Sequence, residues 1–108
     1  MHSIDFLEMK EYQSRDAAVI VNVLPADHFR KSHIPGSVNI PFEHDNFMGE
    51  VENVIGGKNM PVILYCASKE CDLSRKAAKK LIDSGFGNVM VYEGGIKEWE
   101  QKNALTAA

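Results

Sequence analysis

The sequence predicts an α/β protein in which helices lie on both sides of a central parallel sheet. Three apolar runs without polar alternation, at residues 18–23, 61–65 and 88–92, are typical of strands covered on both faces. Stretches of helical periodicity separate these runs. Because parallel strands that alternate with helices are joined by right-handed crossovers, the helices divide between the two faces of one sheet.

The remaining strands and helices are predicted from shorter patterns. Short strands are expected at residues 3–4 and 38–40. Weaker helical candidates precede the second apolar run and follow the last one, at residues 6–15, 26–31, 43–54 and 96–102.

The clearest helix begins after the second apolar run. One of its faces carries apolar side chains at helical spacing, at Leu73, Ala77, Leu81 and Ile82. Asp72 is placed to cap its start, and Gly85 is placed to end it.

Length and composition indicate one folded domain over residues 1–108, without internal repeats or linkers. Apolar residues make up 44% and charged residues 25% of the chain, which excludes a disordered protein. A formal charge of −3 without a basic run excludes electrostatic capture by nucleic acid or an anionic membrane. No apolar stretch approaches the roughly 20 residues of a membrane helix, and residues 1–5 lack the basic-then-apolar order of an export signal. We therefore expect a cytoplasmic protein with neither nucleic acid nor membrane as a partner.

Cys66 directly follows the apolar run at 61–65, and a short polar loop then leads into the clearest helix. Ligands of open parallel sheets bind beyond the carboxyl ends of the strands. The N–H groups of a curved loop and of the helix N-terminus favour a thiolate, a persulfide anion or a bound oxyanion there. The pattern indicates a nucleophilic Cys66, with a buried structural thiol as the alternative.

The loop after Cys66 is the candidate binding site for a small anion. Lys69 and Arg75 add positive charge, whereas Glu70 and Asp72 oppose it, so the sign of the net effect on the thiol stays open. The residues predicted to bind substrate are Ala67, Ser68, Lys69, Glu70, Cys71, Asp72 and Arg75.

An ordered set of short motifs covers most of the chain, from Ala18 to Trp99. It comprises VNVLPADHF at 21–29, HIPGSVNIP at 33–41, LYC at 64–66, the helix with Ala77, Ala78 and Leu81, GFGNV at 85–89 and GGIKEW at 94–99. Together these motifs resemble the rhodanese family. The resemblance implies a three-layer α/β/α domain around a parallel sheet and the chemistry of a sulfurtransferase.

In this chemistry a thiolate takes the sulfane sulfur of a small donor anion as a Cys-S-S⁻ persulfide. Thiosulfate, a persulfide or a polysulfide is the donor, and cyanide or a thiol, including one on a protein, is the acceptor. Cys66 matches the nucleophile because it directly follows the strand. The resemblance implies no cofactor, and the histidines and cysteines show no zinc-ligand spacing. In the family His33 and the turn after it are mainly architectural, so we expect His33 to bind backbone.

The sequence departs from the family pattern in and beyond the loop. In active members of the family, four residues separate the nucleophilic cysteine from an Arg or Ser. This chain has Cys71 at that position. Its Ser74 and Arg75 come later, as they would if the loop were two residues longer. Asn22 and Leu24 replace the Asp and Arg of the family's Asp-Val-Arg motif, which leaves open the substrate contacts attributed to that pair.

Cys71 has two interpretations. As a resolving thiol it would attack a Cys66 persulfide, release sulfide and leave a Cys66–Cys71 disulfide. As a structural residue it is a small side chain near the helix N-terminus. We favour the structural interpretation, since a curved loop holds the two sulfur atoms apart.

Two other functions compete with sulfur transfer. A Cys-x5-Arg phosphatase or arsenate reductase needs a clamping Arg where this chain has Asp72, whose charge repels a dianion. The other alternative is a non-catalytic rhodanese-like binding or regulatory module. The replacement of the family's Asp and Arg by Asn22 and Leu24 favours this module, whereas the retained nucleophile position at Cys66 argues against it. A thiol pKa near the free value of about 8.5 indicates that module, and a lowered pKa indicates an active site.

Overall fold

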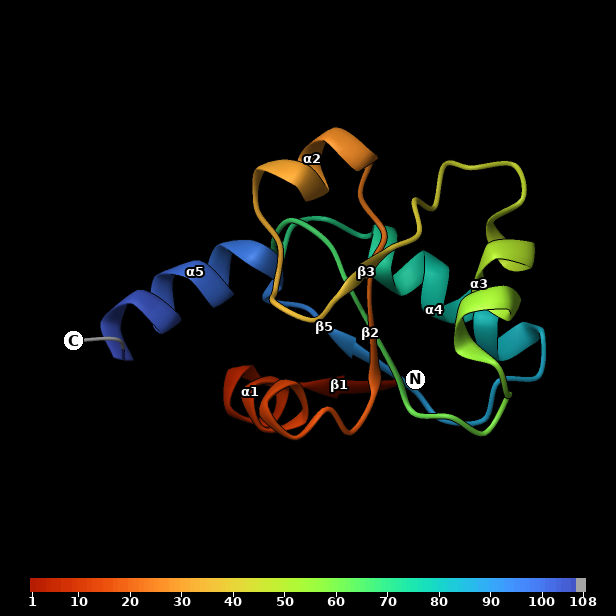
Figure 1. Ribbon diagram of the computed structural model, residues 1–108, viewed down its shortest axis with the longest axis horizontal. Helices are drawn as coiled ribbons and strands as arrows, with labels where there is room; N and C mark the ends of the chain where they lie inside the picture. Colours follow the sequence, from red (N-terminus) through yellow and green to blue (C-terminus); the bar gives the residue numbers. More distant parts are fainter. Residues whose placement is uncertain (107–108) are drawn as a thin grey trace.

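The computed structural model describes residues 1–106, with the side chains of residues 1–103. Its strands form one sheet in the order β1-β5-β4-β2-β3, and every neighbouring pair is parallel (Figure 1). The strands are β1 (His2–Ile4), β2 (Val19–Asn22), β3 (Val38–Asn39), β4 (Val62–Tyr65) and β5 (Val89–Tyr92). The helices are α1 (Phe6–Arg15), α2 (Ala26–Lys31), α3 (Phe47–Ile55), α4 (Leu73–Asp83) and α5 (Gly95–Thr106). Within this part of the chain, no helix has the length and apolar content needed to cross a membrane.

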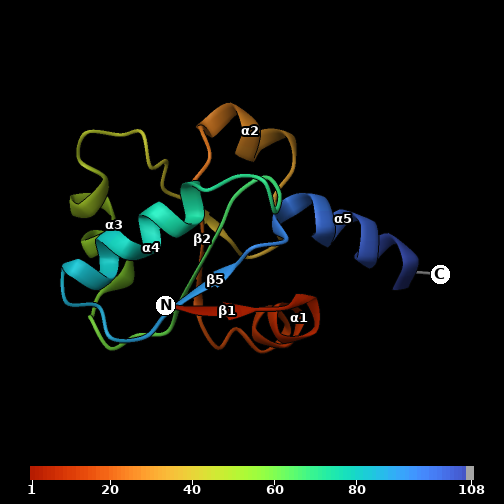
Figure 2. The ribbon, with the colours of Figure 1, turned by 180° about the vertical axis from the view of Figure 1, so that it is seen from behind.

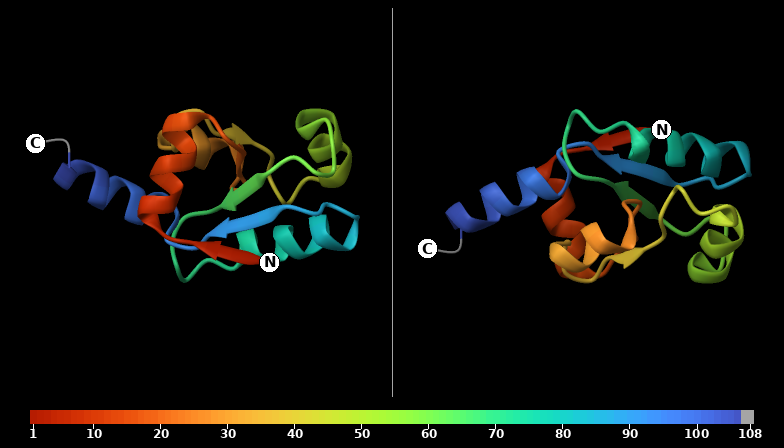
Figure 3. Two further views of the ribbon diagram at one scale, coloured as in Figure 1. Left: turned by 90° about the horizontal axis from the view of Figure 1, so that it is seen from below. Right: turned by 90° about the horizontal axis from the view of Figure 1, so that it is seen from above.

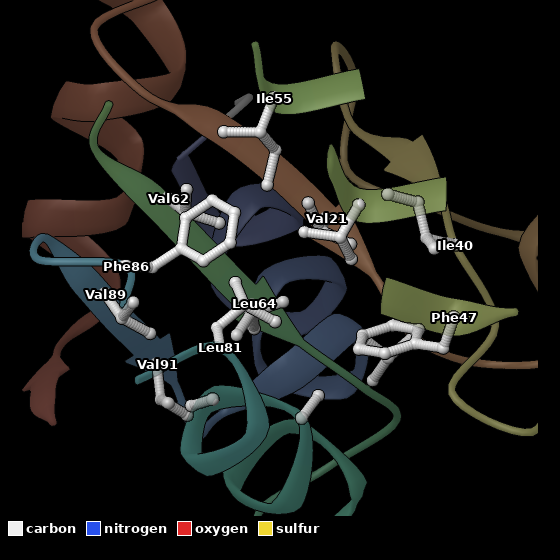
Figure 4. Close-up of a cluster of buried hydrophobic side chains, with 14 of the residues drawn as sticks. Val21, Ile40, Phe47, Ile55, Val62, Leu64, Leu81, Phe86, Val89 and Val91 are labelled. Atoms are coloured by element: carbon white, nitrogen blue, oxygen red, sulfur yellow. The ribbon is translucent and has the colours of Figure 1, made fainter. Parts of the chain in front are cut away.

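Two separate apolar clusters cover the two faces of the sheet, which confirms the predicted three layers. One cluster joins β2, β4 and β5 to α3 and α4, and Figure 4 shows Leu64 and Val21 facing Leu81 and Phe47. The other cluster joins the opposite face of the same strands to α1 and α5. Successive residues of a strand point to opposite faces, so a strand buried on both sides is apolar throughout. This explains why β2, β4 and β5 lack polar alternation.

The ends of α4 differ in how well the sequence predicts them. Asp72 is the N-cap residue, but its side chain makes no capping hydrogen bond and pairs instead with Lys76 at 3.3 Å. The prediction that Asp72 caps the helix is therefore wrong. Gly85 follows the C-cap with φ +98°, and the N–H groups of Gly85 and Phe86 bind the carbonyls of Ile82 and Leu81. This Schellman arrangement confirms the predicted stop.

α3 begins later than the sequence predicts, at Phe47 instead of residue 43. The N–H of His44 binds the carbonyl of Pro41 at 3.2 Å, and the N–H of Phe47 binds the carbonyl of His44 at 3.1 Å. Hydrogen bonds across three residues form turns, so the polar segment before Phe47 does not continue the helix.

The segment between α2 and β3 holds a buried tyrosine of β4 in place. The N–H of Ser37 binds the carbonyl of Ile34 at 3.0 Å, and Gly36 has φ +87°, which closes the turn. The hydroxyl of Tyr65 accepts from the N–H of Ile34 at 3.0 Å and pairs with the Ser37 hydroxyl at 2.8 Å. His33 donates from Nδ1 to the carbonyl oxygen of Phe29 at 2.8 Å, which confirms its predicted backbone contact.

Replacing Tyr65 with Phe is expected to lower the free energy of unfolding by about 1–3 kcal/mol, because the buried N–H of Ile34 loses its partner. Urea unfolding followed by circular dichroism measures the change. A loss below about 0.5 kcal/mol would show that water replaces the hydroxyl without cost.

Candidate active site

Cys66 lies at the carboxyl end of the central strand of the sheet. β4 pairs with β2 on one side and with β5 on the other, and Cys66 directly follows Tyr65, its last residue. The following loop leads to α4, whose first residue is Leu73. The predicted order of strand, cysteine, loop and helix is confirmed.

The first turn of α5 holds the base of this loop. The N–H of Ile96 binds the carbonyl of Cys66, and the N–H of Lys97 binds the carbonyl of Ala67, each at 3.0 Å. Figure 2 shows the loop between β4 and α4 arching over to the start of α5, and in Figure 3 the rest of α5 leads away from the sheet. The free N–H groups of a helix N-terminus are thus used to fix the main chain beside the cysteine.

Gly95 makes this close approach possible. Its φ is +67°, and a Cβ atom there would lie 2.6 Å from the carbonyl oxygen of Cys66 and 2.7 Å from the carbonyl carbon of Ala67. Only glycine meets both conditions without strain. No local sequence pattern predicts this contact with the loop.

The Cys66 sulfur is buried beneath the loop. The residue is 1% exposed and belongs to the cluster between the sheet and α4. Its Sγ lies 3.4 Å from the carbonyl oxygen of Cys71 and 3.5 Å from Oγ of Ser74. Ser74 lies in the first turn of α4 and also directs its backbone N–H to the sulfur. Sequence reasoning missed Ser74, although its place in the first helical turn is the signal that points to it.

Burial raises the pKa of the Cys66 thiol, and the neighbouring Cys71 raises it further. The hydroxyl and the backbone N–H of Ser74 oppose this rise only in part. The N–H of Ser74, at the start of α4, favours the thiolate as the sequence predicts. Burial outweighs this effect, so the resting site favours a neutral thiol.

Charged side chains in and after the loop form hydrogen bonds or ion pairs with nearby residues of the protein. The Ser68 hydroxyl donates to Glu70 at 3.0 Å and lowers the pKa of that carboxyl. Arg75 pairs with Glu93 at 3.3 Å. Ser68, Lys69 and Glu70 line a pocket of about 390 Å³ against α5, and Cys66 is not among its lining residues. Of the residues predicted to bind substrate, Cys71 is the one that the structure brings to the sulfur.

Comparison with known proteins identifies the fold. Residues 5–102 match the family model described as the Rhodanese-like domain. The chain belongs to the rhodanese-like family. The rhodanese-like domain is similar to the structure of the BH2092 protein from Bacillus halodurans, with a TM-score of 0.81 and 25% identity over 94% of this chain and 73% of that one.

Curated relatives of this rhodanese-like domain include named sulfurtransferases and uncharacterized proteins. The chain is 36% identical to the uncharacterized protein YibN of Escherichia coli over 83% of its own length and 61% of YibN. It is 28% identical to the thiosulfate sulfurtransferase GlpE of Shewanella oneidensis, over 79% of this chain and 78% of GlpE. The chain spans less than two thirds of the length of the first curated relatives that it matches.

The side chain of Asn22 stabilises the turn after β2 in this rhodanese-like domain. The side chain is fully buried, and its Oδ1 accepts from the N–H of Leu24 at 2.9 Å, which closes the turn after β2. Its Nδ2 has no hydrogen-bond partner among the described residues. An Asp at this position could accept the same hydrogen bond, but it would bury a carboxylate in place of the neutral amide.

Proposed function

We propose that this rhodanese-like domain is a sulfurtransferase that carries sulfane sulfur as a persulfide on Cys66. The observation that carries the proposal is the place of Cys66 at the end of the central strand, with the hydroxyl and N–H of Ser74 beside its sulfur. The name of the relative GlpE supports thiosulfate as one donor. A reducing compartment such as the cytoplasm, which keeps both cysteines as thiols, suits this chemistry.

The reaction has two steps. The Cys66 thiolate attacks the sulfane sulfur of thiosulfate, the S–S bond of the donor breaks, and sulfite leaves with the electron pair. An acceptor, cyanide or the thiolate of a small molecule or protein, then attacks the terminal sulfur of Cys66-S-S⁻ and restores the Cys66 thiolate. Covalent catalysis of this kind replaces one difficult transfer by two easier ones. Ser74 stabilises the Cys66 thiolate, which begins the first step and is restored in the second, because the hydroxyl and the N–H of Ser74 both face Sγ of Cys66.

Access to the sulfur limits the first step. Since Cys66 is 1% exposed, a donor reaches it when the loop at residues 68–72 moves away from the cluster. The base of the loop stays fixed by α5 through the carbonyls of Cys66 and Ala67. The opening therefore occurs between Ser68 and α4.

Incubating the reduced protein with thiosulfate is expected to add one sulfur atom to Cys66 before any onward transfer, as intact-mass spectrometry of samples quenched early measures. Cys66→Ser should take up none, whereas Ser68→Ala, which removes the hydrogen bond from the Ser68 hydroxyl to Glu70, should still form the adduct. The proposal would be overturned if thiosulfate, polysulfide and glutathione persulfide gave no adduct, no released sulfide and no disulfide.

The second candidate is a non-catalytic rhodanese-like module, which the raised pKa and the burial of Cys66 favour. It predicts that none of the three donors modifies the folded protein. The phosphatase or arsenate reductase is disfavoured, because Asp72 stands where its clamp is needed and Arg75 is paired with Glu93. Hydrolysis of an aryl phosphate that depends on Cys66 would revive it.

A further inference from the structure

The loop brings two free thiols together. Cys66 is buried and Cys71 is half-buried, and neither forms a disulfide. The N–H of Cys71 binds the carbonyl of Ser68 at 3.0 Å, which folds the loop back toward its start. As a result the Cys66 sulfur lies 3.4 Å from the carbonyl oxygen of Cys71. The side chain of Cys71 packs against the cluster that contains Cys66.

The side chain of Cys71 lies on the same side of the sheet as Cys66, since it packs against the cluster that contains Cys66. The pKa of Cys66 is raised by the Cys71 side chain, which agrees with this placement. The interpretation of Cys71 as a small structural residue assumed that a curved loop keeps the sulfurs apart. The turn between Ser68 and Cys71 instead brings the main chain of Cys71 to the Cys66 sulfur.

We infer that Cys71 is the resolving thiol of this site, which attacks the inner sulfur of a Cys66 persulfide and releases sulfide into solution. The inference rests on the proposed function, because it needs the persulfide to form. It also accounts for the burial of Cys66, since an acceptor inside the loop does not have to enter from solvent.

The step balances without any other reactant. The thiol of Cys71 attacks Sγ of Cys66-S-S⁻, a Cys66–Cys71 bond forms, and the bond between Sγ and the terminal sulfur breaks. The terminal sulfur leaves with the electron pair and the Cys71 proton as HS⁻. It is reduced to sulfide while the Cys71 sulfur is oxidised to the disulfide. An external dithiol reductant then restores both thiols for the next cycle.

The test compares the reduced protein with Cys71→Ser, without oxygen and without any acceptor. After addition of thiosulfate, we expect the unchanged protein to release one sulfide per chain and to form the disulfide. Cys71→Ser should instead retain the persulfide and release sulfide at least about tenfold more slowly, because it lacks the neighbouring thiol. The same protein kept without thiosulfate controls for disulfide formed by residual oxidants.

Trypsin separates the two cysteines, since Lys69 lies between them. Peptide mapping after alkylation should therefore show residues 59–69 linked to residues 70–75 in the unchanged protein. This measurement needs no variant, so it holds even if Cys71→Ser folds poorly. A persulfide found on the peptide with Cys71 would overturn the sulfide-release step, because attack would then occur at the terminal sulfur.

Two further outcomes separate this inference from the proposed function. An equally stable Cys66 persulfide in both proteins would overturn the resolving role and leave sulfur transfer intact. No adduct, no sulfide and no disulfide in either protein would overturn both.

Discussion

Replacing Gly95 with alanine is expected to lower the free energy of unfolding by about 3 kcal/mol or more. The added Cβ would meet the carbonyl oxygen of Cys66 at 2.6 Å, and the carbonyl carbon and oxygen of Ala67 at 2.7 and 2.8 Å. These are main-chain atoms, so no side-chain rotation relieves the contact. Either α5 or the base of the loop must shift, and the hydrogen bonds from Ile96 and Lys97 are then lost. Urea unfolding measures the stability, and alkylation of Cys66 reports on the loop.

Gly56 provides the matched control. It also has a positive φ, of +72°, but a Cβ there would meet nothing within 4 Å. Gly56→Ala should therefore cost only the backbone strain, about 1–2 kcal/mol, and leave Cys66 unreactive. Equal losses for the two variants would show that φ alone matters and that the contact between α5 and the loop is unimportant.

Alkylation of Cys66 by iodoacetamide at pH 7 is expected to be at least about a hundredfold slower in the folded protein than in the chain unfolded in guanidinium. Two effects act in the same direction. Burial restricts access to the sulfur, and it also raises the thiol pKa, so less thiolate is present. The rate should rise with pH beyond the free thiol value of about 8.5, because the folded protein holds the proton more tightly. Mass spectrometry of the tryptic peptides separates Cys66 from Cys71.

Ser74→Ala is the informative variant for this measurement. The hydroxyl of Ser74 lowers the pKa of Cys66, so its removal should move the pH profile of alkylation to still higher pH. A Cys66 that reacts fastest near neutral pH would contradict the buried, protonated thiol.

The same pKa shift links stability to pH. A group with a raised folded-state pKa stabilises the protein fully below its unfolded pKa, here about 8.5, and loses that contribution as the pH rises through the folded value. The protein should therefore lose stability on the alkaline side through Cys66.

Most of the fold could be predicted because its signals are local. Strands buried on both faces are continuous apolar runs, and the stripe of α4 has helical spacing, so β2, β4, β5 and α4 follow from the sequence. The position of Cys66 follows for the same reason, since it needs only the end of β4. The start of α3 was harder to predict, because the same polar residues occur in turns and in the first turn of a helix.

The surroundings of the sulfur could not be predicted, because they depend on contacts between distant segments. Gly95 is 29 residues from Cys66 in the sequence, and no local pattern shows that α5 binds the loop backbone. Whether amides or apolar side chains face Cys66 depends on the path of the loop. That path buries the sulfur and brings the main chain of Cys71 to it.

The anchor formed by α5 has a consequence for how such domains diversify. Its hydrogen bonds hold only the first two main-chain carbonyls after the strand, those of Cys66 and Ala67. The sequence beyond Ala67 can therefore change in length and composition without loss of these two hydrogen bonds. Substitutions that alter the reactivity of the loop are thus separable from those that alter the stability of its base.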